Sequence, residues 1–545
     1  MIILGIHGGV TLGQHDPAAA LFRDGELIAC VEEERLFRIK SPRGMLPIEA
    51  IQAVLREAGI TMHEVDLVAH PGETYQDAPA RIPAYLKHYF GHAPKLRLIN
   101  HQTAHLASAF FQSGYDSAMV MSYDAYGDRL SAALATASRT DGIRVLETRD
   151  NVNSLGLFYA TMTSYLGFLP GEDEYKVMGL APYGEAKYDL SFFARPSKDG
   201  YFVDSPGAMR SDPGPKSNFE PFYGDAIVNK LGPARLKGEP IEQHHRDVAA
   251  STQRTLEECA ISLVNYLHGM TGERNLCLAG GVALNCSANN VLRQMECVDR
   301  MFVQPAASDR GLALGCGLQA AWEEGETIAP ITHVFYGPTR TDAEIERALG
   351  VTGFTAERVD DPSAAAASLL AEGKIVGWFQ GRSEFGPRAL GHRSILANPC
   401  VADMKDQINA RVKYREEFRP FAPSVLEEKC RDVFVMDEPS PFMTVAFDVQ
   451  DGWGEKLPAT THVNNTARVQ SVSADTDPMY HRLITELENH SGAPVVLNTS
   501  FNIKGQPIVE TPLDALSTFA GTGMDAVIMG HYMVRKPGAP RAQDK

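Results

Sequence analysis

A weak internal repeat constrains the fold of this 545-residue chain more than any other feature of its sequence. The first copy begins with the apolar segment 2–6, passes through a turn that contains Asp16, and closes a hairpin at Asp24-Gly25. The second copy repeats this order from residue 118, and its hairpin closes at Asp141-Gly142. An Asp-Gly pair between apolar segments is a strong hairpin signal. The chain therefore contains strand, acidic turn and hairpin twice.

This duplication predicts an actin-like ATPase architecture, in which two ribonuclease-H-like halves clamp a nucleotide between their phosphate-binding turns. The alternative is a pair of unrelated β-hairpins, because Asp-Gly turns are common. Beyond the hairpins, helical and strand-like segments alternate. Segment 47–59 reads as a helix before the strand-like 65–70, and 255–272 as a helix before 275–279. This alternation predicts an α/β fold class.

The length of the chain indicates two domains, because 545 residues exceed what one hydrophobic core usually serves. Residues 330–360 are rich in polar and turn-forming residues. We therefore predict an N-terminal domain of residues 1–350 and a C-terminal domain of residues 351–545.

Composition narrows the class of function. With 44% hydrophobic and 22% charged residues the chain is typical of globular proteins. A formal net charge of -17 argues against nucleic-acid binding, which needs a basic surface. No apolar run approaches the roughly 18 residues of a membrane span, and no signal peptide is evident. The eight cysteines form no CxxC pair and are expected to be reduced. We expect a cytoplasmic protein that uses small molecules.

Four side chains predict a metal centre: His101, His105, Asp124 and Asp309. Two histidines four residues apart share one face of a helix. The two aspartates follow apolar strand-like segments, where a carboxylate is costly unless it is paired or coordinates an ion. The alternative is histidines satisfied by backbone groups. Mixed imidazole and carboxylate ligation suits Fe, Mn, Zn or Mg, so the sequence leaves the metal open.

Several glycines and polar residues are candidates for nucleotide binding. Gly280-Gly281 follows a strand-like segment and precedes a helix with Asn285, so the backbone could approach a phosphate closely; a tight strand-to-helix turn is the alternative. Gly127 and Asp128 lie in the acidic turn of the second copy. Lys176 lies in a segment that either covers a ligand or only connects elements. The chain has no Walker A sequence, and Gly315-Cys316-Gly317 lacks the spacing of a dinucleotide fingerprint.

The C-terminal half carries a dense cationic cluster in an otherwise acidic chain. Six arginines fall within residues 382–419, together with His392 and Lys413. Arginine binds phosphate oxygens in a bidentate manner, so a phosphorylated small molecule is the predicted partner. The alternative is a set of surface pairs with neighbouring glutamates. Polar residues after the strand-like 494–497, including Asn498 and Ser500, lie where open α/β sheets bind ligands.

Taken together, the motifs resemble the O-carbamoyltransferase family of natural-product and nodulation-factor biosynthesis. That family is similar to the threonylcarbamoyl-adenylate machinery of tRNA modification. The resemblance extends over essentially the whole chain. The motifs that carry it are HDPAAALFRDGELIACVEEERLFRIK, NHQTAHLASAF, EYKVMGLAPYG, LAGGVALN, SDRGLALG, GRSEFGPRALGHRSILANP, KYREEFRPFAPSV and NTSFNIKGQPIV.

The resemblance implies a fold and a set of site residues. The expected fold is a Kae1-like N-terminal domain, the duplicated actin-like ATPase with ribonuclease-H-like halves, plus a YrdC-like α/β C-terminal domain. The first would bind ATP and, through the four residues above, a divalent metal, with iron as the implied ion and Mg as the alternative. The matching carbamoyl phosphate positions are Arg388, His392, Lys413, Arg419, Arg468, Asn498 and Ser500. Among these Arg388, His392 and Lys413 are expected to be catalytic, and His15 or Asp16 is the candidate base that activates the acceptor.

The implied activity is ATP-dependent O-carbamoylation. Carbamoyl phosphate loses its phosphate, and the carbamate attacks the α-phosphorus of ATP to give carbamoyladenylate and pyrophosphate. The carbamoyl group then passes to a hydroxyl of a small-molecule acceptor, as in antibiotic biosynthesis. One alternative is a threonylcarbamoyl-type transferase acting on tRNA, which the acidity of the chain disfavours. Another is a non-catalytic actin-like nucleotide-binding protein, in which the arginine-rich region has no role. The acceptor and any homo-oligomer stay open.

Overall fold

A computed structural model describes residues 1–10, 13–210 and 221–536. The chain divides into two compact units. The first comprises Met1–Glu32 and Ser41–Ile331, and the second comprises Glu33–Lys40 and Thr332–Lys545. The second unit therefore begins before the predicted boundary at residue 350, and it also includes the short helix α1 (Glu33–Phe37).

The early start of the second unit has a packing reason. Helix α12 (Asp342–Thr352), which the sequence assigns to the end of the first domain, packs against α18 (Pro512–Ala520) near the C-terminus. Helix α1 is joined to the same unit by Arg38, which donates to the carbonyl of Ile508 at 2.6 Å and lies 3.4 Å from the Asp514 carboxylate.

The first unit contains two five-stranded sheets with the same topology and a two-stranded sheet of β9 (Ala194–Ser197) and β10 (Gly200–Val203). In each five-stranded sheet, the first three strands are antiparallel neighbours, and the fourth and fifth run parallel to the first. The first sheet has the order β3 (Glu26–Glu32), β2 (Ala18–Arg23), β1 (Ile2–His7), β4 (Leu67–Pro71), β5 (Lys95–Ile99). The second has the order β12 (Arg300–Val303), β11 (Asn275–Ala279), β6 (Ser117–Gly127), β7 (Leu130–Ser138), β8 (Gly142–Asp150). The predicted duplication of ribonuclease-H-like halves is confirmed.

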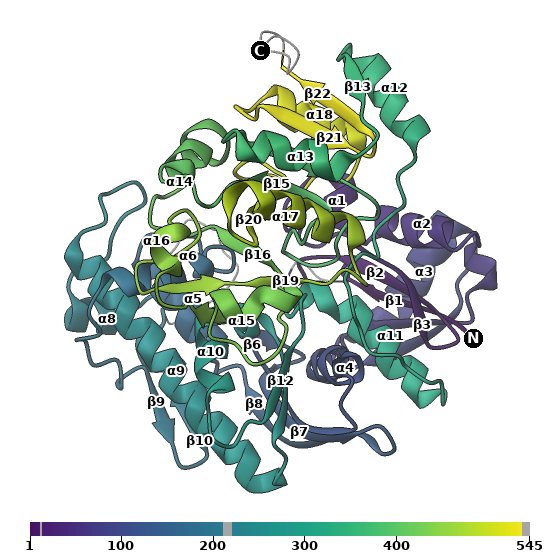
Figure 1. The fold of residues 1–545 in the computed structure, drawn as a ribbon. Coiled ribbons are helices and arrows are strands. Elements are labelled where there is room, and N and C mark those ends of the chain that lie inside the picture. The colour runs from purple at the N-terminus through teal and green to yellow at the C-terminus, as the bar shows by residue number, and fades with distance from the viewer. Residues whose placement is uncertain (11–12, 211–220, 537–545) are drawn as a thin grey trace. The chain divides into compact units, whose positions relative to one another are not determined.

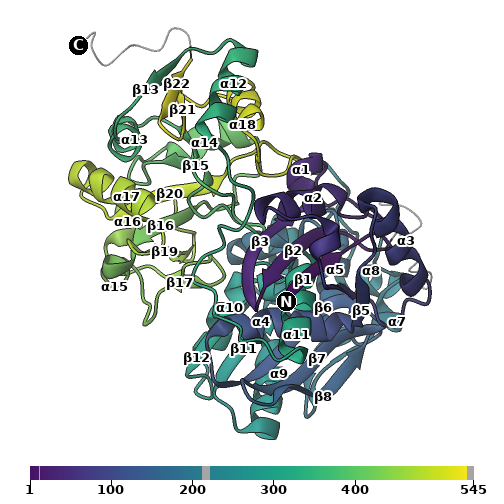
Figure 2. The ribbon, with the colours of Figure 1, turned by 90° about the vertical axis from the view of Figure 1, so that its right-hand side faces the viewer.

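Each half places its last helix against the sheet of the other half. Helix α4 (His101–Ser113), which follows β5, packs on β6 and β11, and α11 (Leu312–Glu323), which follows β12, packs on β1 and β4. The two helices lie side by side in Figures 1 and 2. A Cβ atom at Gly315 would lie 1.9 Å from the Ala104 carbonyl oxygen. Gly315 therefore allows the close approach of α11 to α4.

Both helices predicted from the sequence are present in the first unit. Helix α2 (Ile48–Glu57) packs on β2 and β3, in agreement with the helix predicted at 47–59. The helix predicted at 255–272 is the C-terminal part of a longer one, α9 (Gln243–Thr271). Helix α9 packs against α5 (Leu155–Tyr165), α6 (Glu174–Leu180) and α10 (Cys286–Arg293).

The second unit contains one mixed eight-stranded sheet, which agrees with the predicted α/β class. Its order is β13 (Ala356–Arg358), β22 (Tyr532–Arg535), β21 (Ala526–Met529), β14 (Val376–Phe379), β15 (Arg393–Ala397), β20 (Val495–Ser500), β16 (Ala422–Leu426), β19 (Gln470–Val472). Trp378 and Phe379 point to opposite faces and enter two separate cores. Helices α13 (Pro362–Ala371) and α17 (Pro478–Ser491) cover the Trp378 face and lie side by side (Figure 1).

Two further expectations concern the chain as a whole. All eight cysteines lie in the described residues and are free thiols, as predicted. Within the described ranges, no helix combines the length and the apolar character that crossing a lipid bilayer requires.

Candidate metal centre and donor site

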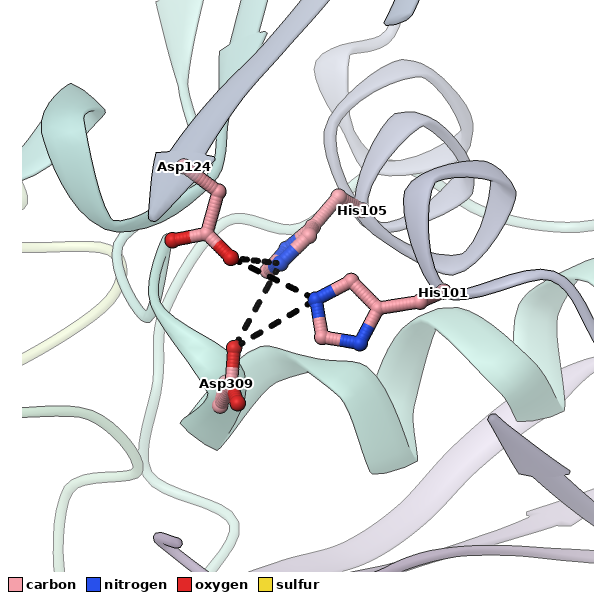
Figure 3. Close-up of side chains that lie close together, drawn as sticks. All are labelled: His101, His105, Asp124 and Asp309. Carbon is pink, nitrogen blue, oxygen red and sulfur yellow. Dashed lines mark hydrogen bonds and ion pairs between the residues drawn. The ribbon is translucent and has the colours of Figure 1, made fainter. Parts of the chain in front are cut away.

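The four predicted metal ligands converge in the first unit (Figure 3). His101 and His105 lie on the first turns of α4, Asp124 lies in β6, and Asp309 begins the short helix η4 (Asp309–Gly311) before α11. Their ligand atoms all lie within 4.8 Å of one another. The His101 Nε2 atom is 3.3 Å from Asp124 Oδ2 and 3.6 Å from Asp309 Oδ1. The equivalent atom of His105 is 3.6 Å from both oxygens.

The four ligand side chains, and the fact that they are buried, fit a divalent metal ion. All four side chains are buried, and neither ring nitrogen of His105 has a partner at hydrogen-bond distance among the described residues. Burial lowers the pKa of His105, but the Asp124 and Asp309 carboxylates more than compensate and raise it to about 9. Two imidazoles and two carboxylates facing one point are a ligand set suited to Fe, Mn or Zn. The cluster can therefore hold a metal ion.

Three predicted nucleotide-binding residues shape this centre directly. Gly127 lies against the His101 ring, and a Cβ atom there would be 2.2 Å from His101 Cγ. The backbone N–H of Gly281 donates to Asp124 Oδ1 at 3.0 Å. Asp128 accepts the backbone N–H of His101 at 2.8 Å and the hydroxyl of Thr74 at 2.7 Å. These contacts fix the metal ligands, and contact with a nucleotide stays a prediction.

His15 and Asp16, the candidate bases, lie beside the cluster. The Nε2 atom of His15 is 3.8 Å from Asp309 Oδ2, and its Nδ1 atom is 3.1 Å from Asp16 Oδ2. Burial lowers the pKa of His15, but the Asp309 and Asp16 carboxylates raise it to about 9. Asp16 is also paired with Arg310 at 3.1 Å. Burial raises the pKa of the Asp16 carboxyl, but Arg310 and His15 together hold it well below its usual range.

Two residues at this site were not predicted from the sequence. Arg310 follows the ligand Asp309 directly, so the SDRG motif contained a signal for it. His7 ends β1, and its Nε2 atom lies 3.8 Å from Asp309 Oδ2. Burial lowers the pKa of His7 to about 3, so its ring is neutral. A single histidine at the end of a strand offers no recognisable pattern.

The remaining nucleotide candidates lie outside the four-ligand cluster. Lys176, in α6, forms an ion pair with Asp173 at 2.8 Å. Asn285 caps α10 and exchanges hydrogen bonds with Gln253 at 2.9 and 3.0 Å. Gly280 has a φ of +87° and packs against the Tyr123 carbonyl, where a Cβ atom would be 2.3 Å from the oxygen. These steric reasons are sufficient to require glycine at residue 280, and contact of Gly280 with a nucleotide stays a prediction.

In the second unit, Lys413 and Ser500 come together from different elements. Lys413 ends the π-helical turn η5 (Asn409–Lys413), and Ser500 ends β20. The Lys413 ammonium donates to the backbone carbonyl of Ser500 and lies 3.3 Å from its hydroxyl. Burial, with Arg415 and Arg419 nearby, holds the pKa of Lys413 well below its usual value.

The loop that carries Arg388 and His392 is held from within the same unit. One oxygen of the buried Glu384 carboxylate accepts the backbone N–H groups of Leu390, His392 and Arg393 at 2.8–3.0 Å. Asn498 donates to the carbonyl of Ala389 at 3.1 Å. The structure thus brings Asn498 to the Arg388 loop.

The structure also describes the other residues that are predicted to bind carbamoyl phosphate. The His392 ring stacks on Phe335 with centroids 3.6 Å apart. Arg419 lies 3.5 Å from the Glu416 carboxylate, the kind of pairing that the alternative interpretation proposed for this cluster. Arg468 ends β18 (Thr466–Arg468), which pairs with β17 (Ala446–Asp448).

Fold and site together define a class. The first unit has the duplicated sheets of the actin-like ATPase fold and holds a buried imidazole–carboxylate cluster. The second unit of the same chain has a mixed α/β sheet. The chain belongs to the carbamoyltransferase family: the family model described as carbamoyltransferase N-terminus matches residues 3–89 and 73–318, and that described as carbamoyltransferase C-terminus matches residues 367–536. The protein is therefore an enzyme of the carbamoyltransferase type.

Similar proteins include two nodulation proteins. NolNO of Sinorhizobium fredii is 37% identical over 98% of this chain and 83% of its own length. NolO of Bradyrhizobium diazoefficiens is 40% identical over 80% of this chain and 79% of its own length. Among solved structures, HypF of T. kodakarensis aligns with a TM-score of 0.38 at 12% identity, covering 59% of this chain and 48% of HypF.

Proposed function

We propose that this carbamoyltransferase uses ATP and carbamoyl phosphate to form carbamoyladenylate and then carbamoylates a hydroxyl of a small-molecule natural product. The observation that carries the proposal is the pair of built sites in one chain. One is a buried imidazole–carboxylate cluster in the first unit, and the other is a buried lysine among arginines in the second. The first suits a metal–nucleotide complex, and the second suits a phosphorylated donor.

In the proposed first stage, water attacks the carbonyl carbon of carbamoyl phosphate, and the bond to the phosphate oxygen breaks. Lys413, Arg388 and Arg419 would bind the dianionic phosphate and stabilise the charge that it carries away. A carboxylate oxygen of the resulting carbamate then attacks the α-phosphorus of ATP, and pyrophosphate leaves. The three products of this stage are inorganic phosphate, carbamoyladenylate and pyrophosphate.

In the proposed second stage, the acceptor hydroxyl attacks the carbonyl carbon of carbamoyladenylate, and AMP leaves. His15 in its deprotonated form, oriented by Asp16 at 3.1 Å, or the Asp16 carboxylate itself, would accept the proton of that hydroxyl. His101, His105, Asp124 and Asp309 would hold a divalent metal, with iron as our proposed ion, and this ion would supply positive charge to phosphate oxygens. The acidity of the chain favours a small acceptor over tRNA.

Pyrophosphate release from ATP by the full chain tests the proposal. We expect release to require carbamoyl phosphate, and we expect Arg388→Ala to abolish it while ATP binding is retained. Release that is independent of carbamoyl phosphate, or equal loss of ATP binding in Arg388→Ala, would contradict the division of sites. The acceptor can then be sought by mass spectrometry as a hydroxyl compound that gains about 43 Da.

A further inference from the structure

We propose that Asn502 positions the donor-binding groups, because its side-chain oxygen holds the Lys413 ammonium and the Ser500 hydroxyl in one arrangement. This inference rests on the proposed function, in which Lys413 and Ser500 bind carbamoyl phosphate. Asn502 lies outside the set of residues that the family resemblance assigns to the donor.

One oxygen atom of Asn502 joins the two groups. Its Oδ1 atom is 2.8 Å from Lys413 Nζ and 2.7 Å from Ser500 Oγ, and the backbone oxygen of Asn502 is 3.0 Å from the same ammonium. The side-chain Nδ2 atom donates to the Gln506 carbonyl at 2.7 Å. Because a carbonyl oxygen only accepts hydrogen bonds, this contact fixes the amide with its oxygen facing Lys413.

The contact between Lys413 and the Ser500 hydroxyl is one that the phosphate of the donor can replace. An ammonium has three hydrogens, whereas Lys413 faces four oxygens of Ser500 and Asn502. The Ser500 hydroxyl gives its own hydrogen to Asn502, and it lies furthest from Lys413, at 3.3 Å. A phosphate oxygen that displaces this contact would receive a hydrogen bond from Lys413.

An amide is the side chain that suits this role. Burial and two neighbouring arginines disfavour the charged form of Lys413. A neutral amide oxygen orients the ammonium and leaves its positive charge available to an anion. A carboxylate in the same place would also orient the ammonium but would neutralise it. If only the orientation of the ammonium matters, Asn502→Asp should bind the donor like the wild type. If the free positive charge matters as well, Asn502→Asp should bind it more weakly.

The test compares Asn502→Ala with Asn502→Asp in the full chain. Both variants lose the bond to the Gln506 carbonyl and keep the backbone oxygen of residue 502, but only aspartate keeps a side-chain oxygen beside Lys413. We expect KM for carbamoyl phosphate to rise about tenfold in Asn502→Ala and further in Asn502→Asp, with KM for ATP unchanged. Binding of inorganic phosphate, measured by calorimetry, should weaken in the same order. Gln506→Ala, which keeps the backbone carbonyl, is the matched control and should resemble the wild type.

Two results would overturn the inference. If Asn502→Asp and Asn502→Ala are both folded and raise KM for carbamoyl phosphate equally, the loss of the Gln506 contact that they share explains the effect, and the residue only supports the loop. If KM for both substrates rises equally, the effect is not on the donor. A different failure concerns the proposed function itself: a wild-type chain that neither uses carbamoyl phosphate nor binds inorganic phosphate would remove the donor site, and this inference with it.

Discussion

The imidazole of His101 occupies the space that a side chain at Gly127 would need. An ideal Cβ atom on Gly127 would lie 2.2–2.3 Å from the ring atoms of His101. Gly127 ends β6 after a shift in the β6–β7 register between Tyr123 and Gly127, and Asp124 lies within this irregular stretch. An irregularity of this kind re-aims side chains and is common near functional sites. The strand thus supplies one metal ligand and makes room for another.

Substitution of Gly127 tests this relationship. Gly127→Ala should displace the His101 ring, reduce bound metal, and lower the free energy of unfolding by about 1–3 kcal/mol through overpacking. Metal content by elemental analysis and denaturant unfolding measure the two effects. Gly269→Ala, on α9 with open space around the new methyl group, is the control and should gain about 0.5–1 kcal/mol. Full metal content in Gly127→Ala would contradict the steric argument.

Removal of one carboxylate ligand should release the metal. In Asp309→Asn the charge that faces His101 and His105 at 3.6 Å is lost, so metal affinity should fall at least about tenfold. Metal content of the purified protein is the measurement. Asp299→Asn removes a surface carboxylate that pairs with Arg274 at 2.6 Å, and it should keep its metal. Equal metal content in the two variants would argue against the four-ligand centre.

Asp128 should stabilise the protein in the absence of any nucleotide. Asp128→Ala leaves the backbone N–H groups of His101, Glu73 and Thr74 without their acceptor. Since unsatisfied buried donors are costly, the free energy of unfolding should fall by about 2–4 kcal/mol. Urea unfolding without ATP measures this. Unchanged stability would contradict this role of the carboxylate at the start of α4.

The stability of the protein should decrease with pH because of Glu174. Burial raises the pKa of this side chain to about 7, from a value near 4.5 in the unfolded chain. The folded state therefore binds more protons between these values, and stability that is present below about pH 4.5 is lost as pH rises to about 7. Partial exposure limits the loss to about 2 kcal/mol.

Glu174→Gln isolates this contribution, because glutamine resembles the protonated acid. The variant should unfold like the wild type near pH 4.5 and be more stable than the wild type at pH 8. Thermal unfolding across this range measures the difference. A difference that does not change with pH would rule out the titration of Glu174 as its cause.

Much of the fold followed from local patterns. The two Asp-Gly hairpins identified the duplicated halves, since turn chemistry and strand alternation act over a few residues. The position of the second unit's start did not follow, because α12 joins it through contacts with α18, far along the chain. The inclusion of α1 in that unit depends likewise on Arg38 reaching Ile508.

The sequence by itself determined which chemistry is present: His101, His105, Asp124 and Asp309 as ligand types, and the cations around Lys413. Only the tertiary structure decided how these groups are held. Gly127 and Asp128 shape the His101 end of α4, and Asn502 joins Lys413 to Ser500. The physical reason is that hydrogen bonds and steric contacts between distant segments depend on packing, which spacing along the chain does not encode.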